Sequence, residues 1–113
     1  MRIKVHEYYV YILTNPTKTT TYIGVTNDLA ARLTEHWRNR NDGKTFAGKF
    51  HCYNLIYFES FVDINEAIKR ETDIKKWNRS KKNRLINSKN PSWLFLNADI
   101  CGSWPPFDLI ERF

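Results

Sequence analysis

Two short apolar runs near the start of the chain are separated by a polar, proline-bearing connection. Residues 8–13 (YYVYIL) and 21–25 (TYIGV) are rich in aromatic and β-branched side chains, which favour strands. Successive side chains of a strand point to opposite faces, so residues two apart share a face. The pattern predicts an antiparallel hairpin in which Tyr11 and Tyr22 point the same way from neighbouring strands.

A third apolar run follows a long polar stretch. Residues 51–61 (HCYNLIYFESF) predict a third strand, with Tyr53, Leu55, Tyr57 and Glu59 expected on one face because they alternate along the chain. The sequence therefore predicts three strands, the third reached only after an intervening helical segment.

That helical segment begins near Asp28, with Thr26 or Asn27 as the expected N-cap. Its apolar stripe consists of Leu29, Leu33 and Trp37. Residues 39–49 then form a polar, glycine-bearing connection, which predicts a loop long enough to carry a function.

A second helix is predicted from a capping box, in which Glu66 follows Asp63 by three residues, and it runs to about Trp77. Its expected buried stripe consists of Ile64, Ala67, Ile68 and Ile74. Glu71 falls within about 20° of Ile64 on the helical wheel, in the middle of this stripe. Because a buried unpaired carboxylate costs several kcal/mol, Glu71 is expected to pair with a nearby Lys or Arg, to become neutral, or to bind a hard divalent cation.

The remainder of the chain is basic and then aromatic. Ser80 is the expected cap of a short basic helix that ends near Asn87, and residues 90–93 (NPSW) predict a further short helix or turn. A length of 113 residues is compatible with one domain over residues 1–113, with its core at about 8–97 and a tail at 98–113.

Positive charge is concentrated in one segment. The chain has a net charge of +6, and residues 69–89 hold nine of its 18 Lys and Arg against two acids, Glu71 and Asp73. Such a concentration favours contact with nucleic-acid phosphates, although many charge runs are only solvated helix faces. The side chains expected to hold the DNA backbone are Lys69, Lys75, Lys76, Arg79, Lys81, Lys82 and Arg84.

Cysteine usage and apolar run length indicate the compartment. Cys52 and Cys101 have no CxxC or Cys/His ligand spacing, so we expect no zinc site and two reduced thiols in a cytoplasmic protein. The apolar run at 8–13 is far shorter than the roughly 20 residues of a membrane-spanning helix, so we expect no membrane segment.

Four polar side chains carry candidate chemistry. Arg32 and His36 lie one turn apart on the first helix, where a guanidinium can clamp a phosphate and an imidazole can move a proton. Tyr11 and Tyr22 are poor bases at a reference pKa of about 10 unless cations such as Arg32 or a metal ion lower it. Taken singly, each is more often a structural residue than a catalytic one. Together, they indicate a phosphate-handling site.

The order of these residues resembles the GIY-YIG nuclease superfamily, and most closely its small single-domain, UvrC-like bacterial members. Residues 9–11 (YVY) correspond to the first half of the name motif and residues 22–24 (YIG) to the second, with Gly24 as a structural position. The further matching positions are Asp28, Leu29, Arg32, Leu33, His36, Arg70, Glu71, residues 74–77, Asn83 and residues 90–93. The resemblance spans about residues 8–97, and it departs from the motif at Tyr9, where the family has glycine.

The resemblance implies an α+β fold, an α/β sandwich in which a small three-stranded antiparallel sheet is flanked by helices. It also implies a metal-dependent endonuclease that hydrolyses DNA phosphodiester bonds with one Mg²⁺ (or Mn²⁺), with DNA repair as the expected process. In that reading Glu71 holds the metal, Arg32 stabilises charge on the phosphate, and Tyr11 or Tyr22 is the general base. His36 orients or assists the tyrosine, and Asn83 fixes the local geometry.

Two other functions are compatible with the sequence. One is a non-catalytic nucleic-acid-binding module that retains the fold, and the other is a protein-interaction domain that uses the aromatic tail at 93–113. Larger members of the superfamily append separate DNA-binding domains, and we expect none in these 113 residues. A protein partner that directs cleavage is therefore compatible with the resemblance.

Overall fold

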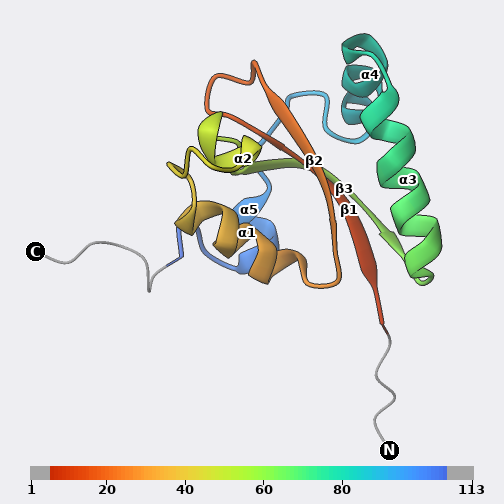
Figure 1. Cartoon of the computed structure of the whole chain (residues 1–113), viewed down its shortest axis with the longest axis horizontal. Helices are drawn as coiled ribbons and strands as arrows, with labels where there is room; N and C mark the ends of the chain where they lie inside the picture. The colour runs from red at the N-terminus through yellow and green to blue at the C-terminus, as the bar shows by residue number, and fades with distance from the viewer. Residues whose placement is uncertain (1–5, 107–113) are drawn as a thin grey trace, which may run out of the picture.

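The computed structural model describes residues 6–106 and places a small antiparallel sheet between two groups of helices (Figure 1). The strands are β1 (Tyr8–Thr14), β2 (Thr21–Thr26) and β3 (Asn54–Phe61). The helices are α1 (Leu29–Arg38), α2 (Phe46–Lys49), α3 (Ile64–Lys76), α4 (Arg79–Lys89) and α5 (Asn97–Cys101). Helices α3 and α4 lie on one side of the sheet, and α1, α2 and α5 lie on the other. The predicted α+β sandwich is confirmed.

The strand order is β2-β1-β3, and both pairings are antiparallel. In the β1–β2 hairpin, Tyr11 pairs with Gly24 and Leu13 pairs with Tyr22. Tyr11 and Tyr22 are therefore diagonal neighbours on one face, and their ring centroids lie 6.3 Å apart. The predicted hairpin and its shared tyrosine face are confirmed.

The register between β1 and β3 contains a bulge. Ile12 pairs with Tyr57, whereas the next residue, Leu13, pairs with Leu55, so Ile56 is the extra residue in β3. A bulge shifts the alternation of side chains, which reverses the faces on its two sides. Leu55 therefore packs toward α1 and Tyr57 packs toward α3. The prediction that Tyr53, Leu55, Tyr57 and Glu59 share one face was wrong.

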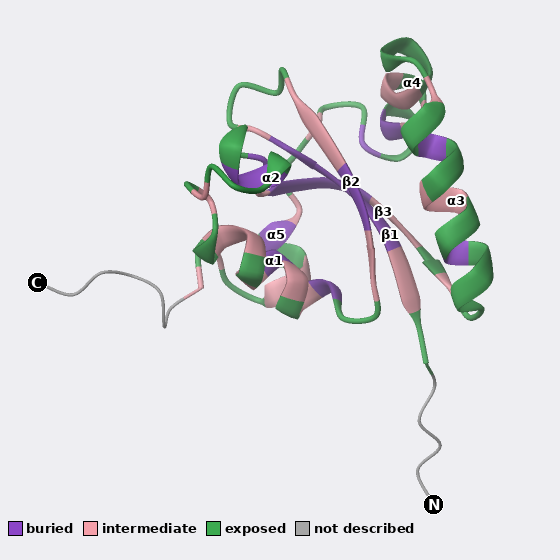
Figure 2. Cartoon of the chain, in the orientation of Figure 1, coloured by how far each residue is buried: buried purple, intermediate pink, exposed green. Residues whose placement is uncertain are grey.

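The sheet buries apolar residues on both faces, as the purple colouring of its centre shows (Figure 2). The core on the α3 side consists of Val10, Ile12, Ile23, Ile56, Tyr57, Ala67, Ile74 and Ile86. The core on the α1 side consists of Tyr11, Leu13, Leu29, Leu33, Ala47, Cys52 and Leu55. Because β1 contributes to both cores, it is the central strand in packing as well as in order.

Helix α3 contacts the sheet through a face that differs from the predicted one. Ala67 and Ile74 are buried as expected, but Ile64 and Ile68 are each 45% exposed. The inward face follows positions 67, 70, 71 and 74, which have the spacing i, i+3, i+4 and i+7. Two of these positions, Arg70 and Glu71, are charged. Because the prediction used apolar residues alone, it placed the buried face of α3 at a different rotation about the helix axis.

Helix ends differ from the expected caps by one or two residues. Asp28 caps α1 by accepting a hydrogen bond from the Ala31 amide, in place of the expected Thr26 or Asn27. Asn78 caps α4 by accepting from the Lys81 amide, in place of Ser80. Asp63 caps α3 as predicted. In each case a short Asx side chain satisfies an amide that the helix leaves unpaired.

The polar connection at 39–49 contains one short helix that the sequence did not predict. Thr45 caps α2 by accepting a hydrogen bond from the Gly48 amide at 3.0 Å. A Cβ atom at Gly48 would overlap the backbone carbonyl of Asp42, so only glycine allows the loop to fold this closely. His51 adopts a positive φ of 59°, which ends this segment and explains why β3 starts at Asn54 rather than at residue 51.

Two buried asparagines cover the outer edge of β3. Asn97 accepts a hydrogen bond from the Leu55 amide at 2.7 Å and donates one to the Tyr53 carbonyl at 2.9 Å. Asn90 donates to the Ile56 carbonyl at 2.8 Å. These side chains form the hydrogen bonds that a neighbouring fourth strand would otherwise form, and so satisfy backbone groups that an edge strand leaves unpaired.

The segment after α4 packs on the domain as far as the structure describes it. The turn predicted at 90–93 is present, and Trp104 contacts Trp37 with ring centroids 5.7 Å apart. The rest of the aromatic tail, residues 107–113, lies outside the described residues. Cys52 and Cys101 are both free thiols, as expected. Within residues 6–106, no helix combines the length and the apolarity that crossing a bilayer requires.

Asn97→Ala is expected to lower the free energy of unfolding by about 2 kcal/mol or more, because the Leu55 amide and Tyr53 carbonyl lose their partners. Urea denaturation of the full chain measures this change. Asn41→Ala, at an exposed loop position, is the control and should stay within about 0.5 kcal/mol of wild type. Equal stability of the two variants would contradict the edge-covering role.

Candidate active site

A tyrosine and a histidine from different elements form the centre of the site. The Tyr11 hydroxyl, on the middle strand β1, lies 3.0 Å from Nε2 of His36 on α1 and forms a hydrogen bond with it. Tyr11 is buried and His36 is half-buried. Burial of both rings fixes their orientation, so this pair is positioned by the α1-side core rather than by solvent-exposed contacts.

Gly24 makes room for this pair. It faces Tyr11 across the β1–β2 ladder, and the Tyr11 ring lies directly over its Cα. A Cβ atom at position 24 would overlap the Tyr11 hydroxyl and come within 2.5 Å of Cζ. The last glycine of the name motif is therefore required by the close approach of a side chain, and not by its own backbone angles.

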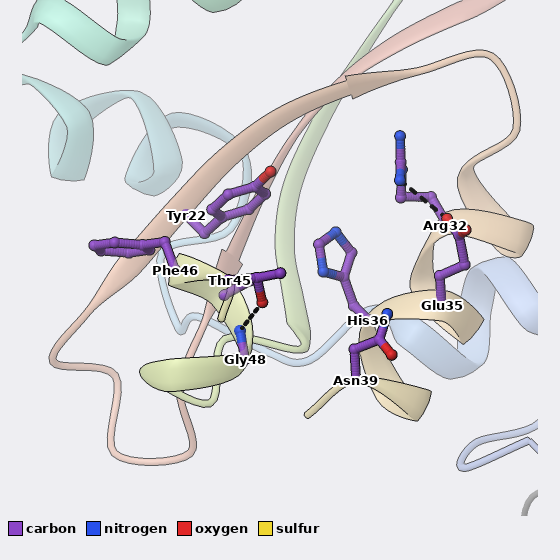
Figure 3. A pocket seen from close by; sticks show the side chains of 9 residues that line it. Tyr22, Arg32, Glu35, His36, Asn39, Thr45, Phe46 and Gly48 are labelled. Carbon is purple, nitrogen blue, oxygen red and sulfur yellow. Dashed lines mark hydrogen bonds and ion pairs between the residues drawn. The ribbon is translucent and has the colours of Figure 1, made fainter. Parts of the chain in front are cut away.

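His36 lines a cavity of about 210 Å³ between β2, α1 and α2 (Figure 3). The lining residues are Tyr22, Arg32, Glu35, His36, Asn39, Thr45, Phe46, Ala47 and Gly48. The ring of Tyr22 lies 5.3 Å from that of His36, so Tyr22 is the second tyrosine of the site. Three of the sequence-predicted residues, Tyr22, Arg32 and His36, thus line one cavity, and Tyr11 contacts it through His36.

Arg32 can exchange its ion-pair partner for an anion at a small cost in free energy. Its Nη1 atom lies 3.0 Å from Oε2 of Glu35, one turn further along α1. Both side chains are about half exposed, and exposed pairs of this kind contribute at most about 1 kcal/mol. A phosphate group is a stronger bidentate partner for a guanidinium, so it can displace Glu35.

The protonation states of the central pair follow from burial. Burial and the charge of Arg32 lower the pKa of His36 to about 4, so its imidazole is neutral near pH 7. Burial is also the largest cause that raises the pKa of Tyr11, and the nearby Tyr22 adds to it. Arg32 lowers the pKa of Tyr11 in the expected direction, but burial outweighs it. Tyr11 is therefore a protonated phenol that faces a neutral imidazole.

Glu71 lies on α3 at the border of the opposite core. Its side chain is 16% exposed, and Lys75 Nζ lies 3.4 Å from its Oε1 atom. The salt bridge that the sequence left open is therefore present. Glu71 also contributes, less than burial and Tyr22 do, to raising the pKa of Tyr11.

The carboxylate of Glu71 fits a hard cation that takes few protein ligands. The described part of the chain contains no group of three or more His, Cys, Asp or Glu side chains arranged to hold a metal. Glu71 supplies one partly buried carboxylate, and Mg²⁺ commonly takes one or two carboxylates together with water and phosphate oxygens. The residues are therefore compatible with a single metal whose remaining ligands come from water and substrate.

A partly buried ion pair beside Glu71 orients α3. Arg70 donates two hydrogen bonds to the Glu59 carboxylate, at 2.9 and 2.8 Å, and the Tyr57 hydroxyl donates another. Burial alone would raise the pKa of Glu59, but the hydrogen bonds from Arg70 and Tyr57 bring it below its usual value. A paired charge at position 70 fixes the rotation of α3 and hence the direction of Glu71.

Asn83 does not line the cavity. Its Oδ1 atom accepts a hydrogen bond from Arg79 Nε at 3.0 Å, and Arg79 Nη1 donates to the Thr19 carbonyl at 2.9 Å. This chain of contacts ties α4 to the loop between β1 and β2. Arg79, expected to bind DNA, is therefore engaged within the fold.

The other basic residues expected to bind DNA are divided between solvent and internal contacts. Those that are exposed are Lys69, Lys75, Lys76, Lys81 and Arg84. Lys82 is half-buried, and Lys81 lies over the Trp77 ring at 4.2 Å. The exposed members lie on α3 and α4, on the side of the sheet opposite the cavity, as the positions of these helices show (Figure 1).

The sequence missed the contribution of α2 to the cavity. Thr45 and Phe46 line it, although they lie in a segment predicted to be a polar loop. The one available signal was Phe46 itself, a large aromatic residue among polar neighbours. The departure from the name motif has a local explanation too, since Tyr9 packs edge-on against Phe58 at 6.3 Å.

The fold and this cluster define a class of catalytic domain. The family model for the GIY-YIG catalytic domain matches residues 7–84. The chain therefore belongs to the GIY-YIG family, whose members are nucleases, and nucleic acid is the substrate that membership implies.

Similar proteins support this assignment. The chain is 37% identical over 68 residues to UPF0213 proteins of Staphylococcus aureus strains Mu3, Mu50 and N315, across 60% of this chain and 80% of theirs. It is also similar to the solution NMR structure of the UPF0213 protein BH0048 from Bacillus halodurans. That match has a TM-score of 0.51 and 25% identity, and covers 81% of this chain and 95% of the other.

His36 is expected to titrate with a pKa of about 4, and Arg32→Met should move that pKa upward, because Arg32 is one cause of the shift. NMR of the imidazole resonances measures both values, and His36→Gln assigns the signal. Between about pH 6.5 and 4 the unfolded chain binds a proton at His36 that the folded chain does not, so stability falls as pH falls through this window. A His36 pKa at or above 6.5 would contradict the buried neutral imidazole.

Proposed function

We propose that this protein is a metal-dependent endonuclease that hydrolyses DNA phosphodiester bonds at the cavity lined by Tyr22, Arg32 and His36. The observation that carries the proposal is the hydrogen bond between the Tyr11 hydroxyl and His36 Nε2, with Arg32 lining the same cavity. A proton acceptor and a phosphate-binding guanidinium are the two groups that phosphodiester hydrolysis needs from side chains.

The central pair supports a proton relay. The oxygen of an attacking water bonds to phosphorus, and the bond from phosphorus to the leaving 3′ oxygen breaks. As this happens the water gives its proton to the Tyr11 oxygen, and Tyr11 passes its own proton to Nε2 of His36. The relay requires the imidazole tautomer with its proton on Nδ1. The low pKa of His36 keeps its imidazole neutral at physiological pH, so Nε2 carries the lone pair to which that proton moves.

The two tyrosines have separate roles in this proposal. Tyr11 is favoured as the general base because it holds the hydrogen bond to His36. Tyr22 lines the cavity and lies against the His36 ring, so it shapes the space in which the phosphate and water are held. Arg32 exchanges Glu35 for a phosphate oxygen and stabilises the charge that develops in the transition state.

Glu71 is the residue that we propose holds a Mg²⁺ or Mn²⁺ ion. When bound, such an ion polarises the scissile phosphate and neutralises the leaving oxygen. Glu71 must release Lys75 to accept a cation, and Lys75 is then free to contact a DNA phosphate. Asn83 has an indirect role, since it supports Arg79 and the hairpin loop.

The setting that we propose is the cytoplasm, which the two free thiols suit. Exposed lysines on α3 and α4 bind the DNA backbone without reading its sequence, because phosphate contacts carry no base information. Nothing in this basic surface selects a cleavage position, so a protein partner that directs cleavage is part of the proposal.

A second candidate is a nucleic-acid-binding domain without turnover. It is favoured by one observation, the ion pair between Glu71 and Lys75, which uses the carboxylate that a metal would need. If the protein is such a binding domain, the DNA affinity of Glu71→Ala should stay unchanged or rise, because the variant loses a negative charge and frees Lys75.

Incubation with supercoiled plasmid and Mg²⁺ or Mn²⁺ is expected to produce nicked circles. Glu71→Gln and Arg32→Ala should each lower the nicking rate about 100-fold or more, and Tyr11→Phe by a comparable factor. The matched control is Glu66→Gln, which removes an exposed acid from the same helix and should nick at the wild-type rate.

Metal-dependent nicking that survives in Glu71→Gln would overturn the role given to that residue. A wild-type protein that binds DNA but nicks no substrate with either metal would instead favour the binding domain. Salt-dependent fluorescence anisotropy with labelled DNA in EDTA measures that binding separately.

A further inference from the structure

Four aromatic rings form a row that leads from the catalytic pair to solvent. We call Phe50, Phe46, Tyr22 and His36 the aromatic row. Successive ring centroids are 4.6, 6.4 and 5.3 Å apart. Figure 3 shows three of these rings around the cavity, with Tyr22 and Phe46 from neighbouring elements. The inner end of the row is His36, which is hydrogen-bonded to Tyr11. The outer end is Phe50, which directly follows α2.

The outer rings are exposed in a way that packing does not explain. Phe46 is 51% exposed and Phe50 is 39% exposed, and neither belongs to the two cores. Helix α2 is held by other groups, namely the Thr45 cap, buried Ala47 and a 2.8 Å hydrogen bond from the Cys52 amide. The two phenylalanines therefore lie outside both cores, and adjacent exposed aromatic rings favour a ligand with a flat apolar face.

The charge around the outer rings indicates which ligand. Lys44 and Lys49 are exposed on either side of Phe46, and Lys49 Nζ lies 5.6 Å from the Phe50 ring centroid. The sequence contains no acid between Asp42 and Glu59. A ligand with both flat apolar faces and negative charge is a nucleic-acid strand whose bases are not paired.

We propose that Phe46, supported by Phe50, stacks an unpaired nucleobase next to the phosphate held at Arg32, so that the substrate is an unpaired strand. This assignment rests on the proposed function for the position of the phosphate. In a duplex the faces of each base are covered by neighbouring base pairs. An aromatic side chain can therefore stack on a base only where the strand is single or the base is extruded. A single-stranded DNA, an unpaired flap and an RNA loop all present this chemistry.

Binding in EDTA tests the platform without cleavage. The full chain is titrated into fluorescein-labelled single-stranded DNA, the matching duplex and single-stranded RNA of the same sequence, at one fixed salt concentration. Phe46→Leu keeps apolar bulk but removes the π face, so it should weaken single-strand binding by about tenfold and duplex binding by less than about twofold. Phe46→Trp should restore single-strand binding. The two single-stranded probes show whether the sugar is also selected.

Phe95→Leu is the matched control, because Phe95 is exposed to a similar extent and does not line the cavity. It should bind all three probes as wild type does. Equal losses on single strands and duplex, or no loss in Phe46→Leu, would overturn the platform. A wild-type dimer in size-exclusion chromatography that becomes a monomer in Phe46→Leu, with unchanged binding, would also overturn it by showing a protein interface.

The outcomes separate this inference from the proposed function. Binding that depends on Phe46 in a protein that never nicks DNA would leave the platform intact and overturn only the nuclease. Metal-dependent nicking by the wild-type protein, together with undiminished single-strand binding in Phe46→Leu, would support the nuclease and overturn only the platform. Glu71→Gln, which should lose nicking, is expected to retain the Phe46-dependent preference, since α2 and α3 lie on opposite sides of the sheet.

Discussion

The hydrogen bond between Tyr11 and His36 depends on the absence of a single side chain. The Tyr11 ring crosses β2 above Gly24, and any Cβ atom there would occupy the position of its hydroxyl. The strand pairing that places Gly24 opposite Tyr11 therefore also places the phenol beside α1. Sheet register and helix packing therefore meet at one close approach, and a change in either moves the phenol relative to His36.

Burial sets the chemistry of this pair more than neighbouring charge does. It opposes charge on both rings, raising the pKa of Tyr11 and lowering that of His36, and Arg32 only partly offsets the effect on Tyr11. A buried phenol that must lose its proton is a weak base by itself. On the proposed function, the neutral imidazole at 3.0 Å is the group to which that proton moves.

The sequence predicted the elements whose signals are local and missed those that depend on contacts distant in the chain. The hairpin, the cap at Asp63 and the alignment of the two tyrosines follow from composition and alternation, and the structure confirms them. The bulge at Ile56 was missed because residues 55–58 (LIYF) are all apolar, so a one-residue register shift among them leaves no trace in the sequence pattern. Helix α2 was missed because its apolar content is one phenylalanine and an alanine. Of the candidate site residues, Tyr22, Arg32 and His36 line one cavity and Tyr11 is hydrogen-bonded to His36, whereas Asn83 pairs with Arg79 away from the cavity.

The two charged candidates share a resting arrangement that suits a substrate made of phosphate and cation. Arg32 pairs with Glu35 three residues along α1, and Glu71 pairs with Lys75 four residues along α3. Each pair is local and partly exposed, so each is weak and can be exchanged. On the proposed function, a phosphate replaces Glu35 at Arg32 while a divalent cation replaces Lys75 at Glu71. The two exchanges compensate each other in charge, and they leave Lys75 free to hold the strand that brought the phosphate.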